Sequence, residues 1–192
     1  MPAAPSSQEE LRFCFFGRLA ANKGLAEFLM AFAKVAHESG AILDIHGAGP
    51  ERAHLEALVS RLRLQDRVKL CGHYPGGSAY AQLLSSYHCL ILPSRGYEGL
   101  PLVLIEAMSC GLPFLATNIG AIPEAATGNK DVVLMSPDEE GMCAGIRECA
   151  RKLRQGLISR ARLREYYQQH FSPEVFEASW RTMLRSPRSF FA

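Results

Sequence analysis

The chain has 192 residues, 48% of them hydrophobic, and its 21 basic and 19 acidic side chains leave a net charge of +2. A chain of this size folds around its own core without disulfides or metal ions, and its composition excludes intrinsically disordered and collagen-like proteins. Apolar runs such as 102–105 are far shorter than the roughly 20 residues of a membrane-spanning helix. A net charge near zero gives no general attraction to nucleic acid.

The first ten residues, 1–10, are rich in Pro, Ala, Ser, Gln and Glu and lack the apolar segment of a signal peptide. We therefore expect a disordered leader and a cytoplasmic protein, with attachment to the inner face of a membrane left open. No CxxC pair and no Cys/His spacing typical of zinc sites occurs. We expect free, buried thiols in a reducing compartment at Cys14, Cys71, Cys89, Cys110, Cys143 and Cys149.

Short apolar segments alternate with longer amphipathic segments from residue 11 to residue 135. The pattern predicts strands over 11–16, 41–46, 67–71, 89–92, 113–117 and 131–135. Between them it predicts helices over 23–39, 51–63, 78–87 and 100–109. Strands this apolar need cover on both faces, which predicts an α/β fold with a doubly wound, Rossmann-like parallel sheet.

From Glu139 onward the pattern is helical, with Asp138 as the expected N-cap and a last helix that begins at Pro173. We expect one domain over 11–170 and a separate C-terminal helical segment over 171–192. Many residues of this region are basic, which fits either a solvated helix face or attraction to anionic lipids. These residues are Arg147, Arg151, Lys152, Arg154, Arg160, Arg162 and Arg164.

Ligands of open parallel sheets bind beyond the carboxyl ends of the strands, so the residues that follow each strand are candidates for a site. Arg18 and Lys23 follow the first strand and suit a phosphate. Pro101, near the start of the helix after the fourth strand, leaves backbone N–H groups free to face an anion. Glu106 lies in that helix among apolar residues, where a carboxylate needs a partner such as a vicinal diol. Taken one at a time, Arg18 and Lys23 also fit ordinary surface cations, and Glu106 fits a helix residue paired with a neighbouring cation. Pro101 likewise fits an ordinary helix start.

Residues 98–106 read EGLPLVLIE, with two glutamates separated by seven residues. This segment is similar to the EX7E motif of family 4 retaining glycosyltransferases, which have the GT-B fold. The similarity extends in the same order over about 13–137, but Ala121 stands where the family often has a second glycine. The other matching segments are Gly17-Arg18-Leu19, Lys23-Gly24, Gly47 to Pro50, Asp66-Arg67-Val68, Gly72, Leu92-Pro93-Ser94, Ala107 to Pro113, Gly120 and Pro123-Glu124.

The resemblance implies that the chain is the C-terminal half of a GT-B enzyme, the half that binds a nucleoside-diphosphate sugar as donor. Arg18 and Lys23 would then hold the donor diphosphate. Gly17 and the backbone of Gly99 and Leu100 would lie against the same phosphates.

By the same resemblance, Glu106 would bind the nucleotide ribose and Gly72 with His73 would lie near the base. Glu98 would lie against the transferred sugar and stabilise positive charge on it, without acting as a covalent nucleophile. A nucleoside diphosphate is an acidic leaving group, with a second phosphate pKa near about 6, so it needs charge stabilisation rather than a general acid. No DxD motif occurs, and we expect neither a metal nor another cofactor.

The resemblance further implies an N-terminal acceptor-binding domain, supplied by a longer protein or a partner subunit, onto which a helix over about 171–184 crosses. The chain alone should bind nucleotide weakly and transfer nothing. Two alternatives stay open: a non-catalytic sugar-nucleotide-binding or regulatory domain, and a GT-B epimerase that acts on a nucleotide sugar. A dinucleotide-binding domain is disfavoured, because the segment 47–52 follows the second strand and lacks the third glycine of GxGxxG. The sequence does not identify the base, the sugar or the acceptor.

Overall fold

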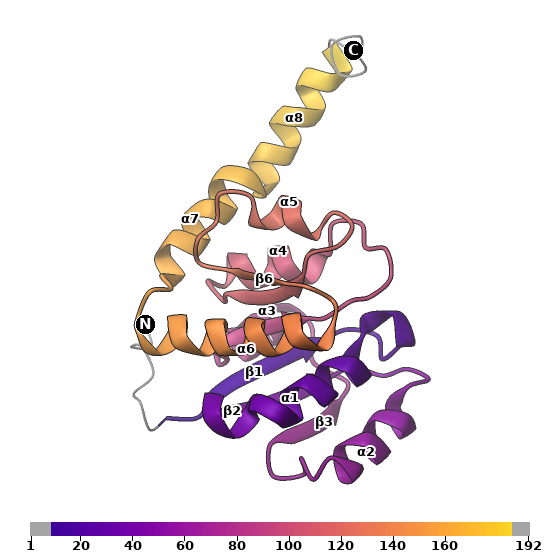
Figure 1. Cartoon of the computed structure of the whole chain (residues 1–192). Coiled ribbons are helices and arrows are strands. Elements are labelled where there is room, and N and C mark those ends of the chain that lie inside the picture. Colours follow the sequence, from indigo (N-terminus) through magenta and orange to yellow (C-terminus); the bar gives the residue numbers. More distant parts are fainter. Residues whose placement is uncertain (1–8, 186–192) are drawn as a thin grey trace.

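The computed structural model describes residues 9–185, and within them six strands form one parallel sheet (Figure 1). The strand order is β3-β2-β1-β4-β5-β6. Strands β2 and β3 therefore lie on one side of β1, and β4, β5 and β6 lie on the other side. This is the doubly wound sheet that the sequence predicts. The strands are β1 (Leu11–Phe16), β2 (Ala41–His46), β3 (Val68–Gly72), β4 (Cys89–Leu92), β5 (Phe114–Thr117) and β6 (Val133–Met135).

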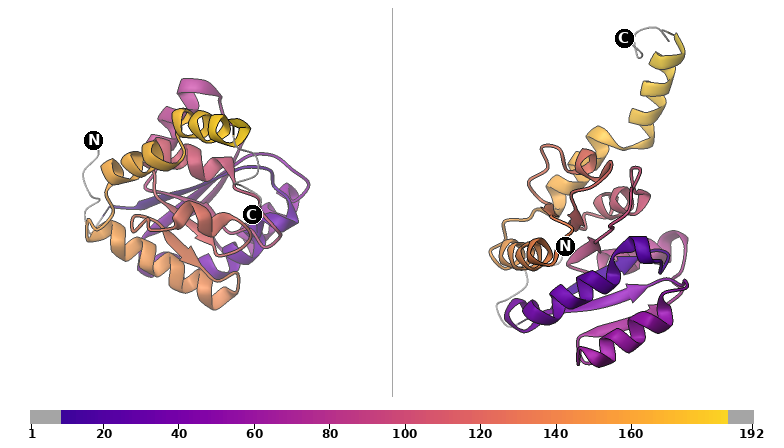
Figure 2. Two further views of the ribbon diagram at one scale, coloured as in Figure 1. Left: turned by 90° about the horizontal axis from the view of Figure 1, so that it is seen from above. Right: turned by 45° about the vertical axis from the view of Figure 1, so that its right-hand side comes forward.

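Helices cover both faces of the sheet (Figures 1 and 2). Helices α1 and α6 pack against each other on one face, and α4 and α7 pack together on the other. The helices are α1 (Leu25–Ser39), α2 (Arg52–Arg61), α3 (Gly77–Ser85), α4 (Leu102–Ser109), α5 (Ile122–Ala126), α6 (Glu139–Arg154), α7 (Arg160–His170) and α8 (Pro173–Arg185).

The core lies where the central strands meet the covering helices. Every residue of β4 and β5 is buried, as expected for strands with a neighbour on each side and a helix layer on each face. On β1, Phe13 and Phe15 are fully buried, as are Phe28 and Phe32 of α1. Each such side chain stabilises the fold by roughly 1.5–3 kcal/mol, so the central strands are held firmly.

Two helix starts next to the site, and one additional helix, differ from what the sequence predicts. Helix α1 begins at Leu25, because Gly24 adopts a left-handed conformation and leaves Lys23 in a 3-10 turn. Helix α4 begins at Leu102, because Pro101 has an extended ψ of 118° and is the N-cap rather than the first helical residue. Helix α5 forms where the sequence pattern indicates only a loop.

The thiols are free, as predicted, but two of them are only half-buried. Cys71 lies on β3, an edge strand, and Cys110 is the C-cap of α4. At both positions the covering layer is incomplete, and the expectation of full burial is wrong for them. The buried thiols are Cys14, Cys89, Cys143 and Cys149.

Helix α8 projects from the body of the domain beyond α7 (Figures 1 and 2). It has no buried residue, and it contacts α7. Phe176, Trp180 and Leu184 are 45%, 58% and 74% exposed. Their spacing of four residues places them along one side of the helix, and we call them the α8 stripe. Of the expected leader and C-terminal segment, 1–8 and 186–192 lie outside the described residues.

The basic residues of α6 and α7 all have partners within the protein. Three pair with carboxylates, namely Arg147 with Glu38, Arg151 with Glu148 and Arg162 with Asp131. Four donate to backbone carbonyls, namely Lys152 to Lys130, Arg154 to Ser39, Arg160 to Ser85 and Tyr87, and Arg164 to Cys110. Most of these contacts attach the two helices to the rest of the domain. Within residues 9–185, no helix combines the length and the apolar character needed to cross a bilayer.

Candidate functional site

The loops that follow β1 and β4 meet at the point where the strand order reverses. The carbonyl of Asn22 accepts hydrogen bonds from the backbone N–H of Arg95, at 2.8 Å, and of Gly96, at 3.2 Å. A Cβ atom on Gly24 would lie 2.0 Å from the carbonyl oxygen of Pro93, so the close approach of the two loops requires glycine at this position. The two loops therefore pack directly against each other at this edge of the sheet.

A cleft of about 420 Å³ opens at this edge. Five residues that the sequence assigns to the site share its wall, namely Gly17, Arg18, Lys23, Glu98 and Glu106. The loops after β1 and β4, together with α4, therefore bring both cations and both glutamates of the prediction into one cavity. The other lining residues are Phe15, Phe16, Tyr74, Leu92, Pro101, Leu102 and Val103.

The Glu98 carboxylate is held on one oxygen by two donors. Its Oε1 accepts from Lys23 Nζ at 2.5 Å and from Ser94 Oγ at 2.6 Å. The Glu98 side chain is only 12% exposed. Ser94 is fully buried, and its carbonyl accepts from Thr117 Oγ1 at 2.6 Å. The Lys23 ammonium is therefore paired with the carboxylate of Glu98.

The backbone at Glu98 is fixed by the loop that follows β5. The N–H of Ala121 donates to the carbonyl of Glu98 at 3.0 Å. Gly120, with φ of +54°, lies so close that a Cβ atom there would be 2.2 Å from the same carbonyl oxygen. The loop after β5 therefore helps to position Glu98, and Ala121 contributes through its backbone N–H.

Glu106 extends from α4 and accepts a hydrogen bond from the hydroxyl of Tyr80 on α3, with an O–O distance of 3.0 Å. The sequence places this glutamate in an apolar setting, which is wrong: Glu106 is exposed, because this side of α4 faces the cleft. Burial, and secondarily the negative charge of Glu106, raises the pKa of Tyr80. The hydroxyl therefore keeps its proton and remains a donor to the carboxylate.

The N-terminus of α4 also borders the cleft. Its N-cap, Pro101, provides no side-chain hydrogen bond to the first turn, and Leu102 and Val103 of that turn line the cavity. Backbone N–H groups at a helix start carry partial positive charge and favour an anion. Gly99 and Leu100 precede this turn but lie outside the lining. A Cβ on Gly99 would meet nothing within 4 Å, so the backbone there is open to a ligand.

The segment after β3 contributes a residue that the sequence analysis missed. Gly72 and His73 lie outside the cleft lining, whereas Tyr74 lines it. The ring of Tyr74 meets that of Phe16 edge to face, with centroids 5.0 Å apart. The aromatic residue directly after the Gly-His pair could have indicated this role, because the loop that follows each strand begins at this edge of the sheet.

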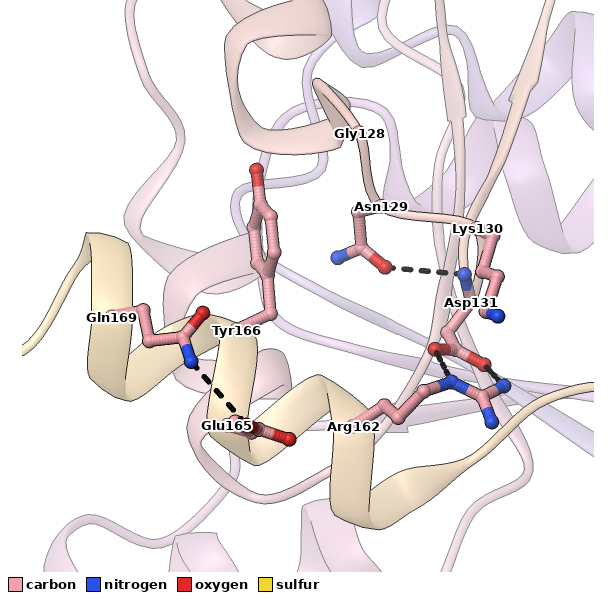
Figure 3. A pocket seen from close by; sticks show the side chains of 8 residues that line it. All are labelled: Gly128, Asn129, Lys130, Asp131, Arg162, Glu165, Tyr166 and Gln169. Atoms are coloured by element: carbon pink, nitrogen blue, oxygen red, sulfur yellow. Dashed lines mark hydrogen bonds and ion pairs between the residues drawn. The ribbon is translucent and has the colours of Figure 1, made fainter.

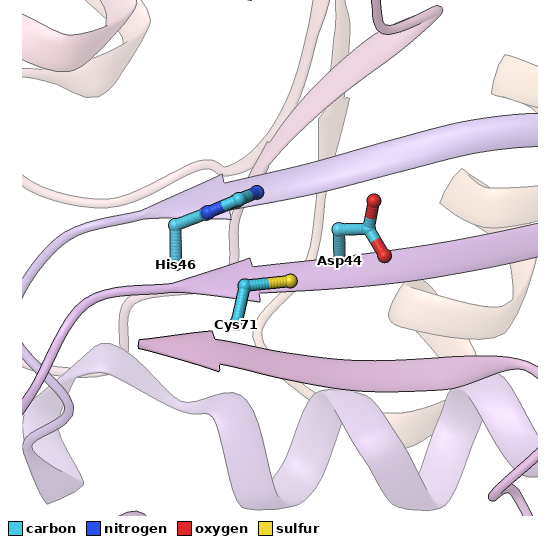
Figure 4. A group of neighbouring side chains, drawn as sticks. All are labelled: Asp44, His46 and Cys71. Carbon is cyan, nitrogen blue, oxygen red and sulfur yellow. The ribbon is translucent and has the colours of Figure 1, made fainter. Parts of the chain in front are cut away.

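His46, at the end of β2, belongs to a hydrogen-bonded network. Asp44, His46 and Cys71 lie side by side on β2 and β3, with potential metal-ligand atoms within 4.8 Å of one another (Figure 4). The Tyr87 hydroxyl donates to Asp44 Oδ2 and lies 2.8 Å from His46 Nε2, and Arg12 pairs with the same carboxylate oxygen. Tyr87 thus joins Asp44 and His46 within the protein, and we assign the network a structural role. Burial lowers the pKa of His46.

A second cavity, of about 380 Å³, lies between the loop before β6 and α7 (Figure 3). Its buried carboxylate, Asp131, receives two hydrogen bonds from Arg162, at 2.8 and 2.5 Å, and one from the backbone N–H of Ser159, at 2.7 Å. The charge of Asp131 is therefore matched within the fold, and the group anchors α7. The remaining lining residues are Gly128, Asn129, Lys130, Glu165, Tyr166 and Gln169.

Proteins with similar sequences transfer sugars, according to their names. N-acetyl-alpha-D-glucosaminyl L-malate synthase of Bacillus anthracis is 38% identical over 102 residues, which cover 53% of this chain and 26% of that protein. One of the subunits of human phosphatidylinositol N-acetylglucosaminyltransferase is 31% identical over 114 residues, which cover 59% of this chain and 23% of that protein. The matched region thus spans about a quarter of each relative.

Solved structures share the fold over half of their length. The crystal structure of Anabaena Alr3699/HepE in complex with UDP superposes with a TM-score of 0.80 and 21% identity, covering 92% of this chain and 49% of that one. This chain therefore has the fold of one half of a GT-B structure, as the resemblance implies. Residues 10–152 match the family described as glycosyl transferases group 1. Because that match covers most of the chain, the protein belongs to the group 1 glycosyl transferases.

Proposed function

We propose that this chain is the donor-binding half of a retaining glycosyltransferase, which moves a hexosyl group from a nucleoside-diphosphate sugar to an acceptor hydroxyl. One observation carries the proposal: Arg18, Lys23, Glu98 and Glu106 line a single cleft at the carboxyl edge of the sheet. Two cations suit a diphosphate, and two carboxylates suit the hydroxyl groups of the sugars attached at either end.

In this proposal the diphosphate lies between the loop after β1 and the start of α4. Lys23 and Arg18 neutralise its charge, and the first turn of α4 offers backbone N–H groups to it. Gly17, Gly99 and the backbone of Leu100 let the phosphates approach closely, because no side chain of the glycines intervenes. These groups are already in place before the reaction, so they stabilise the charge that develops on the leaving diphosphate.

The two glutamates divide the remaining contacts. Glu106 accepts hydrogen bonds from the ribose hydroxyls, and Gly72 with His73 lies near the base. Glu98 faces the transferred sugar, where its negative charge stabilises the oxocarbenium-like transition state. Its hydrogen bonds to Ser94 and Lys23 keep the carboxylate fixed in the cleft.

We further propose that an N-terminal domain or a partner subunit completes the enzyme. The chain spans about half of the GT-B structure that it matches, and the α8 stripe presents Phe176, Trp180 and Leu184 to solvent. An apolar stripe of this kind is stabilised by burial against another surface. The described domain then binds the donor nucleotide but transfers no sugar alone. Attraction of the basic stretch to anionic lipids stays a prediction, which liposome co-sedimentation tests.

Calorimetric titration of the 192-residue chain with UDP, GDP and ADP tests donor binding. UDP is the first choice, because the superposed HepE structure holds it. Lys23→Met should weaken the binding of the preferred nucleotide about 10-fold or more, because it removes a charge-assisted hydrogen bond. Arg151→Met, a matched loss of charge on the outer side of α6, should leave affinity unchanged. Absence of binding at millimolar concentrations, or equal losses in both variants, would refute the donor site.

A second experiment separates the enzyme from its alternatives. In the complete protein, Glu98→Gln should abolish sugar transfer if Glu98 stabilises the transition state. A non-catalytic binding domain would show only a change of affinity. An epimerase would convert the nucleotide sugar into a second nucleotide sugar when no acceptor is present, which product analysis on the donor alone detects.

A further inference from the structure

Tyr80 is hydrogen-bonded to Glu106 but is not among the residues that line the cleft. Its hydroxyl donates to Glu106 Oε2 at 3.0 Å, and this bond links α3 to α4. Glu106 itself is exposed and lines the cleft. The tyrosine thus contacts a residue of the proposed site from outside that site.

The ring of Tyr80 is held in place by its neighbours. It meets the ring of Phe16 edge to face, with centroids 5.2 Å apart, and packs at a tilt against Tyr74, at 5.3 Å. These ring contacts restrict the movement of the ring and therefore of its hydroxyl. A carboxylate that accepts a hydrogen bond from this hydroxyl loses part of its own rotational freedom.

An exposed glutamate otherwise samples several rotamers. Ordering such a side chain when a ligand binds costs roughly a 2- to 12-fold loss of affinity. The Tyr80 hydrogen bond orders the carboxylate beforehand. It occupies one site on Oε2, which leaves Oε1 and the second lone pair of Oε2 for two further donors. Two adjacent acceptors of this kind match the two hydroxyl groups of a vicinal diol.

We propose that Tyr80 is a positioning residue, which holds the Glu106 carboxylate so that the site prefers nucleotides with an intact ribose diol. This inference rests on the proposed role of Glu106 in binding the ribose. It extends that role, because it assigns part of the selectivity for ribonucleotides to a residue outside the cleft lining.

The test compares two ligands on the 192-residue chain by calorimetry: UDP and its 2′,3′-dideoxy form, or the same pair of GDP or ADP if the panel favours that base. Tyr80→Phe keeps the ring and removes only the hydroxyl. It should weaken binding of the ribonucleotide about 3- to 10-fold and leave binding of the dideoxy form unchanged. Tyr166→Phe, the matched loss of a hydroxyl that lies outside the cleft and donates to the Thr127 carbonyl, should leave both affinities and their ratio unchanged.

Two results overturn the proposal. Tyr80→Phe would either leave the affinity ratio unchanged or weaken both ligands equally, as a merely structural role predicts. Glu106→Ala separates this failure from that of the proposed function. If Glu106→Ala lowers the ratio and Tyr80→Phe does not, only the positioning role fails. If neither variant lowers it, Glu106 does not bind the ribose and both proposals fail.

Discussion

Replacing Glu98 by glutamine should make the isolated chain bind a nucleoside diphosphate more tightly. Lys23 Nζ lies 2.5 Å from Glu98 Oε1, and in the proposed site the same ammonium faces the donor diphosphate. The carboxylate therefore competes with the phosphates for one cation. Glutamine preserves the shape of the side chain and an oxygen that accepts from Ser94, but it removes the negative charge.

The size of the effect follows from Coulomb's law. Two anions that touch one ammonium lie about 5 Å apart, where unit charges repel by about 0.8 kcal/mol in water and by about 1.7 kcal/mol at an effective dielectric constant near 40. Because about 1.4 kcal/mol corresponds to a factor of ten, Glu98→Gln should lower the Kd of the diphosphate about 4- to 15-fold for each unit of phosphate charge at that distance.

Calorimetry at two salt concentrations checks this expectation. The gain in affinity should shrink at high salt, because screening weakens the repulsion at this partly exposed site. Compared with Lys23→Met alone, the double variant Lys23→Met with Glu98→Gln should still bind the diphosphate more tightly, because the repulsion between the carboxylate and the phosphates does not require the lysine. If Glu98→Gln instead weakens binding of the diphosphate, the glutamate orients Lys23 for the phosphates, and the reasoning from competition is wrong.

Three further predictions concern stability. Gly120→Ala places a Cβ atom 2.2 Å from a backbone oxygen, whereas Gly128→Ala meets open space at a similar φ of +71°; we expect losses of about 3 and about 1 kcal/mol, respectively, in thermal unfolding. Asp131→Ala removes the buried partner of Arg162 and should cost about 3 kcal/mol in urea; a loss below about 1 kcal/mol would contradict this. Because burial lowers the folded-state pKa of His46, the unfolded chain binds the proton more readily. Stability should therefore fall as the pH drops below about 6.5, and His46→Gln should reduce this slope.

The sequence predicts the sheet well, because the strands are largely apolar runs and glycine or proline ends the first four of them. The bounds 11–16, 41–46 and 89–92 agree with β1, β2 and β4. Helix α5 is not predicted, because five residues are too few for a helical period to show. Helix α4 begins at Leu102 and not at residue 100 as predicted, because a proline fits either the N-cap or the first helical position and the sequence does not distinguish them.

The residues of the cleft are predicted better than their contacts. Four charged residues could be assigned by resemblance, and the doubly wound topology brings them to one edge. The pairing of Lys23 with Glu98 joins residues 75 positions apart, and the Tyr80 hydrogen bond depends on how α3 lies against α4. Such contacts arise from the packing of loops and helices, on which local sequence patterns carry no information.

The long sequence separation between Lys23 and Glu98 also affects how the chain folds during translation. Strands β1, β2 and β3 emerge before β4 and are neighbours in the sheet, so they can pair early. The two glutamates of the cleft follow only with the loop after β4 and with α4. A nascent chain that ends before residue 106 thus lacks the complete cleft, and cellular nucleotides have little to stabilise in it until translation has passed that residue.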